Sequence, residues 1–242
     1  MAYSTDDDWE RLGQTDPFWA VLSEDVYRRE NLSEARLARF LRTGEAYVAD
    51  MWTTCIRVFG EGFDPKRALD FGCGVGRIAL PLSRRVQTVV AVDVADSMLA
   101  IAGDLLKQHG ADNVSLRRAD ATLSGIEGPF DLVHSFLVFQ HVPLARGLKL
   151  IERLTELAAP SGAVVIHVLY DNPFAGSAVS RGIRKLVRMV RPTAVPTISM
   201  NAYPVNAVFK ALQTRGFRNA HVQFTNHGSH LGVLVFAKRG AS

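Results

Sequence analysis

Arg67-Ala68-Leu69-Asp70-Phe71-Gly72-Cys73-Gly74-Val75-Gly76-Arg77 is the stretch that decides the fold. Its first five residues predict a short buried strand, and the glycines after them allow a tight turn that a ligand can approach closely. A helix is expected over residues 77–85, so free N–H groups would lie beside this turn. The spacing is G-x-G-x-G, whereas the dinucleotide fingerprint needs a glycine where Arg77 stands. The stretch therefore indicates a ligand site in an α/β sheet and gives only partial support to a pyrophosphate cradle.

Strands and helices alternate along the rest of the chain. Apolar and β-branched runs predict further strands over 88–93, 114–118, 130–139, 163–169, 220–224 and 232–238. Between them, helical spacing is found after residue 96 and over 144–159 and 203–215. We therefore expect a doubly wound α/β fold whose seven-stranded sheet is mostly parallel, with an antiparallel last strand.

The chain divides into a helical preface and a main domain. Residues 1–60 read as an N-terminal helical lid, and residues 61–242 as a Rossmann-like domain with a basic, substrate-side insertion at about 171–200. Residues 1–54 hold 11 acidic and 6 basic side chains, whereas the remainder holds 13 acidic and 22 basic ones. Within the insertion, 181–192 has the spacing of a basic amphipathic helix. It is interpreted either as a solvated helix or as a contact with an anionic acceptor or a membrane surface carrying a lipid-linked one.

Composition excludes several classes of protein. Hydrophobic residues make up 48% of the 242 residues and charged residues 21%, as in ordinary globular proteins. No run approaches 18 apolar residues and the first residues are polar, which argues against a membrane span or a secretory signal. The two cysteines, Cys55 and Cys73, indicate a reduced protein, and no His/Asp/Glu spacing indicates a metal site. We expect a cytoplasmic protein.

Acidic residues follow three successive strands, at Asp70, Asp93 and Asp120. Ligands of open α/β sheets bind outside the carboxyl ends of the strands, so this ordered set is more informative than any one member. With the glycine stretch above, Val90–Leu99, Arg118–Ala121 and Phe130–Val133, the sequence resembles the class I (Rossmann-like) S-adenosylmethionine-dependent methyltransferases. The resemblance covers roughly residues 40–239.

The resemblance implies S-adenosyl-L-methionine as cofactor and assigns a role to individual residues. The loop from Asp70 through Gly72 and Gly74 to Gly76 would hold the methionine part, and Asp93 the ribose. Contacts with the adenine would come from Val94, Met98, Asp120 and Ala121. Phe136 would lie by the sulfonium, and Gly44 is where the lid would touch the cofactor.

The acceptor side is indicated by polar residues after the fourth and fifth strands. His141 is the candidate catalytic base, because a hydroxyl acceptor benefits from proton removal; its alternative role is to brace the loop. Gln140, His167, Tyr170 and Asp171 are candidate substrate-side residues.

These observations favour methyl transfer from S-adenosylmethionine to a small-molecule acceptor, with a hydroxyl of a saccharide, glycolipid or natural product preferred. The alternatives are an RNA-modifying methyltransferase, a nicotinamide-dependent oxidoreductase and a non-catalytic cofactor-binding protein. The basic balance alone does not indicate nucleic acid as a partner, and Arg77 in place of the last glycine counts against the oxidoreductase.

Overall fold

A computed structural model describes residues 5–172, 198, 200–228 and 230–240 of the chain. The basic segment 181–192 and most of the predicted insertion lie outside the described residues. The helices are α1 (Thr5–Thr15), α2 (Pro17–Val21), α3 (Glu34–Phe59), α4 (Ala79–Ser83), α5 (Asp96–Gln108), α6 (Leu144–Leu157) and α8 (Val205–Thr214). The strands are β1 (Arg67–Phe71), β2 (Thr88–Asp93), β3 (Val114–Arg118), β4 (Phe130–Ser135), β5 (Ala158–Asp171), β6 (Phe217–His227) and β7 (His230–Arg239).

The strands form one seven-stranded sheet in the order β3-β2-β1-β4-β5-β7-β6. Strands β3, β2, β1, β4 and β5 pair in parallel, and β7 pairs antiparallel with both β5 and β6. The expected doubly wound sheet, mostly parallel with an antiparallel last strand and preceded by helices, is confirmed. The change in winding direction lies between β1 and β4, where open α/β sheets bind ligands.

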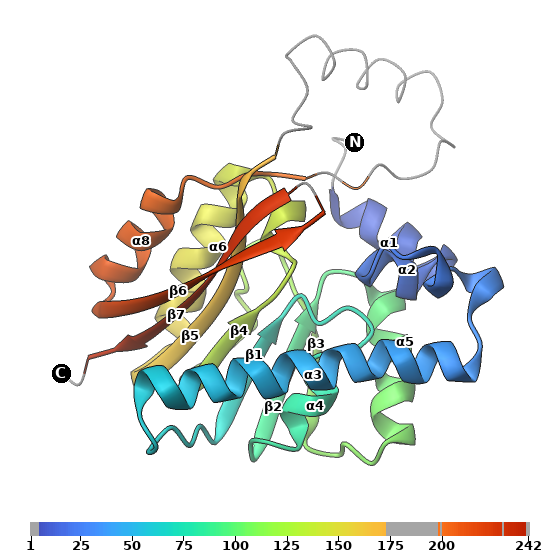
Figure 1. Cartoon of the computed structure of the whole chain (residues 1–242), viewed down its shortest axis with the longest axis horizontal. Coiled ribbons are helices and arrows are strands. Elements are labelled where there is room, and N and C mark those ends of the chain that lie inside the picture. Colours follow the sequence, from blue (N-terminus) through green and yellow to red (C-terminus); the bar gives the residue numbers. More distant parts are fainter. Residues whose placement is uncertain (1–4, 173–197, 199, 229, 241–242) are drawn as a thin grey trace, which may run out of the picture.

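Helices cover both faces of this sheet (Figure 1). On one face, α6 and α8 pack through residues such as Ile151 and Val208 against the apolar side of β1, β4 and β5. On the other, α3 and α4 bury Met51, Trp52 and Leu82 against the same central strands. Both faces of β1 and β4 are therefore covered and mostly apolar, as is usual for parallel strands in the middle of a sheet; Asp70 and His134 are the buried polar exceptions.

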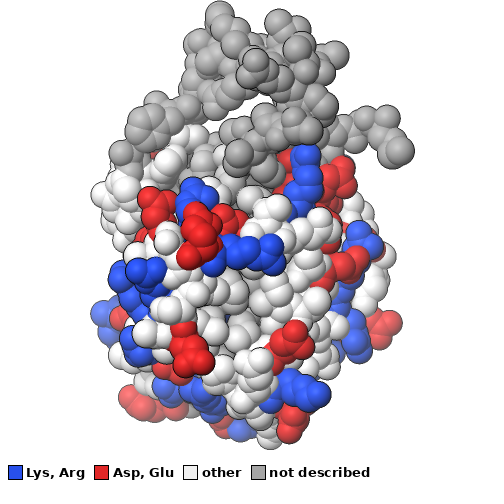
Figure 2. Space-filling model, turned by 90° about the vertical axis from the view of Figure 1, so that its right-hand side faces the viewer, with Lys and Arg blue, Asp and Glu red and all other residues white. Residues whose placement is uncertain are grey.

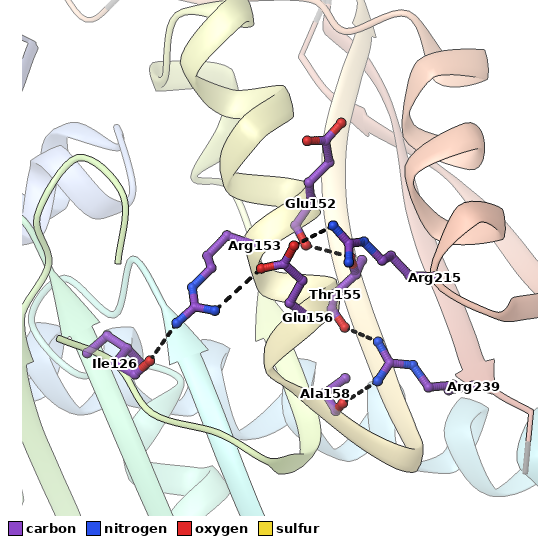
Figure 3. A network of polar contacts seen from close by, with 8 residues as sticks. All are labelled: Ile126, Glu152, Arg153, Thr155, Glu156, Ala158, Arg215 and Arg239. Atoms are coloured by element: carbon purple, nitrogen blue, oxygen red, sulfur yellow. Dashed lines mark hydrogen bonds and ion pairs between the residues drawn. The ribbon is translucent and has the colours of Figure 1, made fainter. Parts of the chain in front are cut away.

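Arginine side chains fasten the end of α6 to its neighbours (Figure 3). Glu156 forms ion pairs with Arg153 of its own helix, at 3.4 Å, and with Arg215, which follows α8. Arg239 of β7 donates to the carbonyl of Thr155, which lies in the last turn of α6 where carbonyls lack a helical N–H, and to that of Ala158, which begins β5. These contacts join the start of β5 and the end of β7 to the C-terminal end of α6, at the edge of the sheet opposite the carboxyl ends of the parallel strands.

Several element boundaries differ from expectation for identifiable reasons. The helix expected over 77–85 is only α4, because Pro81 has no N–H to donate to the carbonyl of Arg77. The strand expected to reach residue 139 ends at Ser135, since Leu137 adopts a φ of 62°. Strand β5 is longer than expected because it keeps pairing with β7 up to Asp171.

Candidate active site

The glycine loop after β1 turns through backbone conformations that side chains disfavour. Gly72 has a φ of 76° and Gly74 a φ of 52°. A Cβ at position 72 would lie 2.3 Å from the side chain of Val138, so glycine permits this close approach. The N–H groups of Gly72 and Cys73 donate to the carbonyl of Val92, at 2.8 and 3.0 Å. The loop is therefore held against the end of β2.

Asp93 ends β2 and faces this loop. Its carboxylate accepts the N–H of Gly74 at 2.8 Å and that of Ala95 at 3.0 Å. Burial raises the pKa of Asp93 to about 6, although these backbone N–H donors oppose the rise. Asp93 thus positions the loop and carries a carboxylate that titrates near neutral pH.

A cleft, partly open to solvent, lies at the carboxyl ends of β1, β2 and β4. This is the edge at which open α/β sheets bind small molecules and cofactors. The residues predicted from the sequence that line it are Gly72, Gly74, Asp93, Val94, Met98, Phe136 and His141. The structure thus brings together residues that lie up to 69 positions apart in the chain.

The first helix lies over this cleft and contributes Thr5, Asp6 and Trp9 to its lining. Asp6 forms an ion pair with Arg146 of α6 at 2.7 Å, and the ring of Trp9 meets that of His141 edge-on with centroids 4.8 Å apart. On the opposite side of α1, Glu10 accepts the N–H of Ser97 at the start of α5 at 3.1 Å. Contacts on both sides of the cleft therefore hold α1 in place.

A chain of buried polar groups connects the glycine loop to α3. Asp70 accepts a hydrogen bond from Nδ1 of His134 at 2.8 Å, and Nε2 of His134 lies 2.9 Å from the hydroxyl of Tyr47. With Nδ1 protonated, Nε2 accepts the tyrosine proton. Tyr47 in turn stacks on Phe136, with ring centroids 4.0 Å apart. The second carboxylate oxygen of Asp70 is buried without a hydrogen-bond partner.

Histidines surround the far side of Phe136. Nε2 of His167 lies 2.8 Å from the hydroxyl of Thr225, and its ring meets those of Phe136 and His227 at centroid distances of 5.2 and 5.1 Å. Burial, with the neighbouring His227 and His141, lowers the pKa of His167 to about 3. His167 is therefore a neutral group of the core, next to the cleft rather than in its lining.

Other predicted site residues lie away from the cleft lining. Asp120 is exposed and accepts hydrogen bonds from Thr122 and Ser124, which lower its pKa; its neighbour Ala119 lines the cleft instead. Ala121 lines a second, adjoining pocket that shares Arg146 and Leu150 with the cleft. Asp120 and Ala121 are therefore near the cleft but not among the residues that line it.

Gly76 and Gly44 serve the packing of the glycine loop. A Cβ on Gly76 would lie 3.4 Å from Ala102 of α5, and one on Gly44 would lie 2.1 Å from the carbonyl oxygen of Arg77. Gly44 therefore lets α3 approach the chain just after the loop. Its predicted contact with the cofactor stays a prediction.

The substrate-side candidates are dispersed. Gln140 is buried, contacts the ring of His141 at 3.2 Å, and its carbonyl accepts the N–H of Asn201, so it braces the loop after β4. Tyr170 packs edge-on against Phe224 with centroids 6.4 Å apart, and Asp171 is exposed. Neither lies in the lining of the cleft.

Sequence reasoning missed several residues that line the cleft: Asp6, Trp9, Arg77, Leu137, Val138 and Arg146. Arg77 directly follows the last glycine of the loop, and this position could have marked it. Trp9 and Asp6 lie in a polar N-terminal stretch without strong periodicity, and nothing in the sequence ties them to the cleft.

Among residues 5–172 and the later described segments, no group of three or more His, Cys, Asp or Glu side chains is arranged to hold a metal ion. Within the same residues, no helix has both the length and the apolar character needed to cross a membrane.

Comparison with known proteins agrees with this geometry. Residues 68–162 match the family model described as a methyltransferase domain. A ubiquinone biosynthesis O-methyltransferase of Caulobacter sp. (strain K31) is 29% identical over 163 residues, which cover 66% of this chain and 58% of that protein. Its counterpart from Paracidovorax citrulli is 24% identical over 62% of this chain and 66% of that protein. The chain thus spans little more than half the length of the first relative.

The fold has counterparts among solved structures. Magnesium protoporphyrin IX methyltransferase from Synechocystis PCC 6803, crystallised with S-adenosylhomocysteine, superposes with a TM-score of 0.66. The alignment covers 97% of both chains at 17% identity, so it shows a shared fold. The sheet order, the glycine loop and the family match agree: residues 68–162 match a methyltransferase domain, in a chain that has the Rossmann-like fold of class I S-adenosylmethionine-dependent methyltransferases.

Proposed function

We propose that this chain transfers the methyl group of S-adenosylmethionine to an oxygen of a small-molecule acceptor. The observation that carries the proposal is the single cleft in which the glycine loop, Asp93, Phe136 and His141 meet at the carboxyl ends of the strands. A site for an electrophilic methyl donor needs mainly to bind the donor and to align a nucleophile with it.

The residues that line the cleft are suited to the parts of S-adenosylmethionine. Gly72 and Gly74 present bare backbone to the cleft, and a buried oxygen of Asp70 lacks a partner near the loop. Asp93 offers a carboxylate able to accept hydroxyl hydrogen bonds, while Val94, Met98 and Ala119 form an apolar wall suited to a flat base. When bound, the cofactor supplies a sulfonium methyl group; the protein binds it, excludes water and orients the acceptor.

His141 supports an oxygen acceptor. It lines the cleft on the loop after β4, where Trp9 packs against its ring and Gln140 contacts it from behind. A histidine held in this way can take a proton from a hydroxyl as the methyl group is transferred. The relatives named as O-methyltransferases of ubiquinone biosynthesis support oxygen over nitrogen as the acceptor atom.

The surface around α1, α2 and α5 favours a small acceptor over RNA. On the face shown in Figure 2, Lys and Arg alternate with Asp and Glu, whereas RNA binding would favour a continuous basic field. Of the proposed acceptors, the apolar lining supports a natural product or another partly apolar molecule better than a bare saccharide. The proposed membrane contact through 181–192 rests on the sequence alone.

Calorimetry and a methyl-transfer screen test this function. S-Adenosylhomocysteine should bind with a Kd in the micromolar range and NAD should not bind. Radiolabelled methyl transfer should occur to at least one hydroxyl compound among phenols, hydroxybenzoates, sugars and glycolipids. Binding of NAD in place of S-adenosylhomocysteine, or transfer to amines alone, would contradict the proposal.

A further inference from the structure

A buried positive charge stands at the edge of the cleft. Arg77 is only 5% exposed, although it lines the cleft and immediately follows the glycine loop. Burial lowers the pKa of its guanidinium, which reflects the loss of water around the charged group. Buried charges are normally paired with an opposite charge, because an unpaired one is strongly destabilising.

The described part of the chain supplies no such pair. Among the described residues, the guanidinium donates one long hydrogen bond, of 3.4 Å, to the hydroxyl of Thr43, and its Nε is buried with no partner. No carboxylate oxygen of the described residues lies within the 4.0 Å that defines an ion pair with it. The ring of Phe136, 6.0 Å away, offers a weak cation–π contact at the limit of its range.

Asp70 is the carboxylate whose charge influences Arg77, but it is held elsewhere. One of its oxygens accepts the hydrogen bond from His134, so the side chain is oriented by the buried chain to Tyr47. Arg146, the other arginine of the cleft lining, is already paired with Asp6. Arg77 is therefore the cation of the cleft that lacks a counter-charge among the described residues.

We propose that the guanidinium of Arg77 binds a carboxylate group of a molecule in the cleft. A planar guanidinium matches a carboxylate through two parallel hydrogen bonds. A single negative charge fits better than a phosphate dianion, because Arg146 is neutralised and Asp93 adds negative charge to the same lining. This inference rests on the proposed function and adds a charged anchor to it.

The carboxylate can come from two sources. One is the amino-acid end of the cofactor, and the other is the acceptor. Matched ligands separate them: S-adenosylhomocysteine carries the carboxylate, whereas 5′-methylthioadenosine lacks the whole amino-acid end. Likewise, 4-hydroxybenzoate carries a carboxylate, whereas methyl 4-hydroxybenzoate is its neutral ester.

The test compares the wild type, Arg77→Gln, Arg77→Lys and Arg84→Gln by calorimetry with all four ligands, the benzoates being titrated with and without S-adenosylhomocysteine. Arg84 is the matched control. It directly follows α4, is half exposed and forms an ion pair with Glu45 of α3. Arg77→Gln should lower the affinity for the carboxylate-bearing ligand about 10- to 100-fold and leave the affinity for the ligand without a carboxylate unchanged. The affinity of Arg77→Lys should lie between those of the wild type and Arg77→Gln, because lysine keeps the positive charge but lacks the planar guanidinium.

Thermal unfolding without ligand separates binding from a structural role. Removing a charge that has no counter-ion should leave the Tm of Arg77→Gln equal to or above that of the wild type, while stabilisation by the carboxylate ligand is lost. If Arg77→Gln loses affinity for S-adenosylhomocysteine alone, the carboxylate belongs to the cofactor. If it loses affinity for 4-hydroxybenzoate alone, the carboxylate belongs to the acceptor. Equal affinity of Arg77→Gln and wild type for S-adenosylhomocysteine, with no carboxylate-dependent binding of benzoate, overturns the inference. Failure of the wild type to bind either adenosine ligand overturns the proposed function instead.

Discussion

The carboxylate of Asp70 and the imidazole of His134 lie 2.8 Å apart in the interior, between the first strand and the fourth. His134 is fully buried and Asp70 is 2% exposed. The hydroxyl of Tyr47 of α3 lies 2.9 Å from Nε2 of His134. The orientation of Asp70, the first residue of the glycine loop, therefore depends on a helix of the N-terminal preface. The two partners of His134 come from distant parts of the sequence, so the sequence alone did not predict this chain of contacts.

Removing hydrogen bonds between Asp70, His134 and Tyr47 should lower the free energy of unfolding, by a different amount for each residue replaced. Tyr47→Phe removes one hydrogen bond and should lower the free energy of unfolding by about 1 kcal/mol. His134→Leu leaves the buried carboxylate of Asp70 without its donor and should cost about 3 kcal/mol or more. Urea unfolding measures both. Tyr170→Phe, on β5 and packed edge-on against Phe224, is the control and should change the free energy of unfolding by less than about 0.5 kcal/mol. Equal effects of Tyr47→Phe and His134→Leu would contradict the linked arrangement.

His141→Ala should separate catalysis from cofactor binding. Loss of a general base should reduce kcat by about 10²- to 10⁴-fold, while the Kd for S-adenosylhomocysteine changes less than about threefold, since the proposed role of His141 is toward the acceptor. Added imidazole should restore part of the activity. His221→Ala, on β6 against Phe236, serves as control and should keep full activity. If His141 only braces the loop, imidazole will not rescue and cofactor affinity will fall together with kcat.

The ion pair between Asp6 and Arg146 should slow ligand release modestly. Both side chains remain partly exposed, at 35% and 23%, so the pair is worth about 0.2–1 kcal/mol. Arg146→Ala should therefore raise the dissociation rate of S-adenosylhomocysteine by about two- to fivefold, and added salt should reduce the difference from wild type. Stopped-flow measurement with Arg39→Ala as control, which breaks a more exposed pair with Glu24, checks this. A charge-swapped double variant, Asp6→Arg with Arg146→Asp, should recover the slow release.

Asp93 should give cofactor binding a pH dependence. Its pKa is about 6 in the ligand-free protein, so below that pH the carboxylate becomes protonated and accepts hydroxyl hydrogen bonds less well. Affinity for S-adenosylhomocysteine should fall as the pH drops from 7 to 5, and Asp93→Asn should bind weakly without this dependence. The unbound protein should behave in the opposite way: a raised pKa stabilises the folded state below pH 4, and this contribution is lost as the pH rises through 6. Calorimetry and urea unfolding across the same pH range test the two trends.

The regular part of the fold was predictable because each strand is signalled locally. The bounds of β1, β2 and β3 match the expected ranges. Strand β2 is an apolar, β-branched run that ends at Asp93, and β1 ends where the glycines begin. The departures come from single residues with backbone constraints, as at Pro81 and Leu137, and from pairing between distant segments, as in the extension of β5 along β7. Tertiary pairing of this kind has no local signature.

The ligand side of the site was predictable to a similar degree. Gly72, Gly74, Asp93, Val94 and Met98 belong to segments whose place at the strand ends follows from the topology, and the structure gathers them in one cleft. The part contributed by α1 was not predictable, because Asp6 and Trp9 reach the cleft through contacts with α6 and the loop after β4. Arg77 was weighed only as a missing glycine, and its burial shows only in three dimensions.

The position of β7 between β5 and β6 has a consequence for biosynthesis. Strand β6 is made first but pairs only with β7, so it has no place in the sheet until residues 230–239 have left the ribosome. During that interval β5 presents an open hydrogen-bonding edge to other nascent chains, which is a recognised route to aggregation. The segment that completes the sheet therefore also ends the period in which the growing polypeptide is most vulnerable.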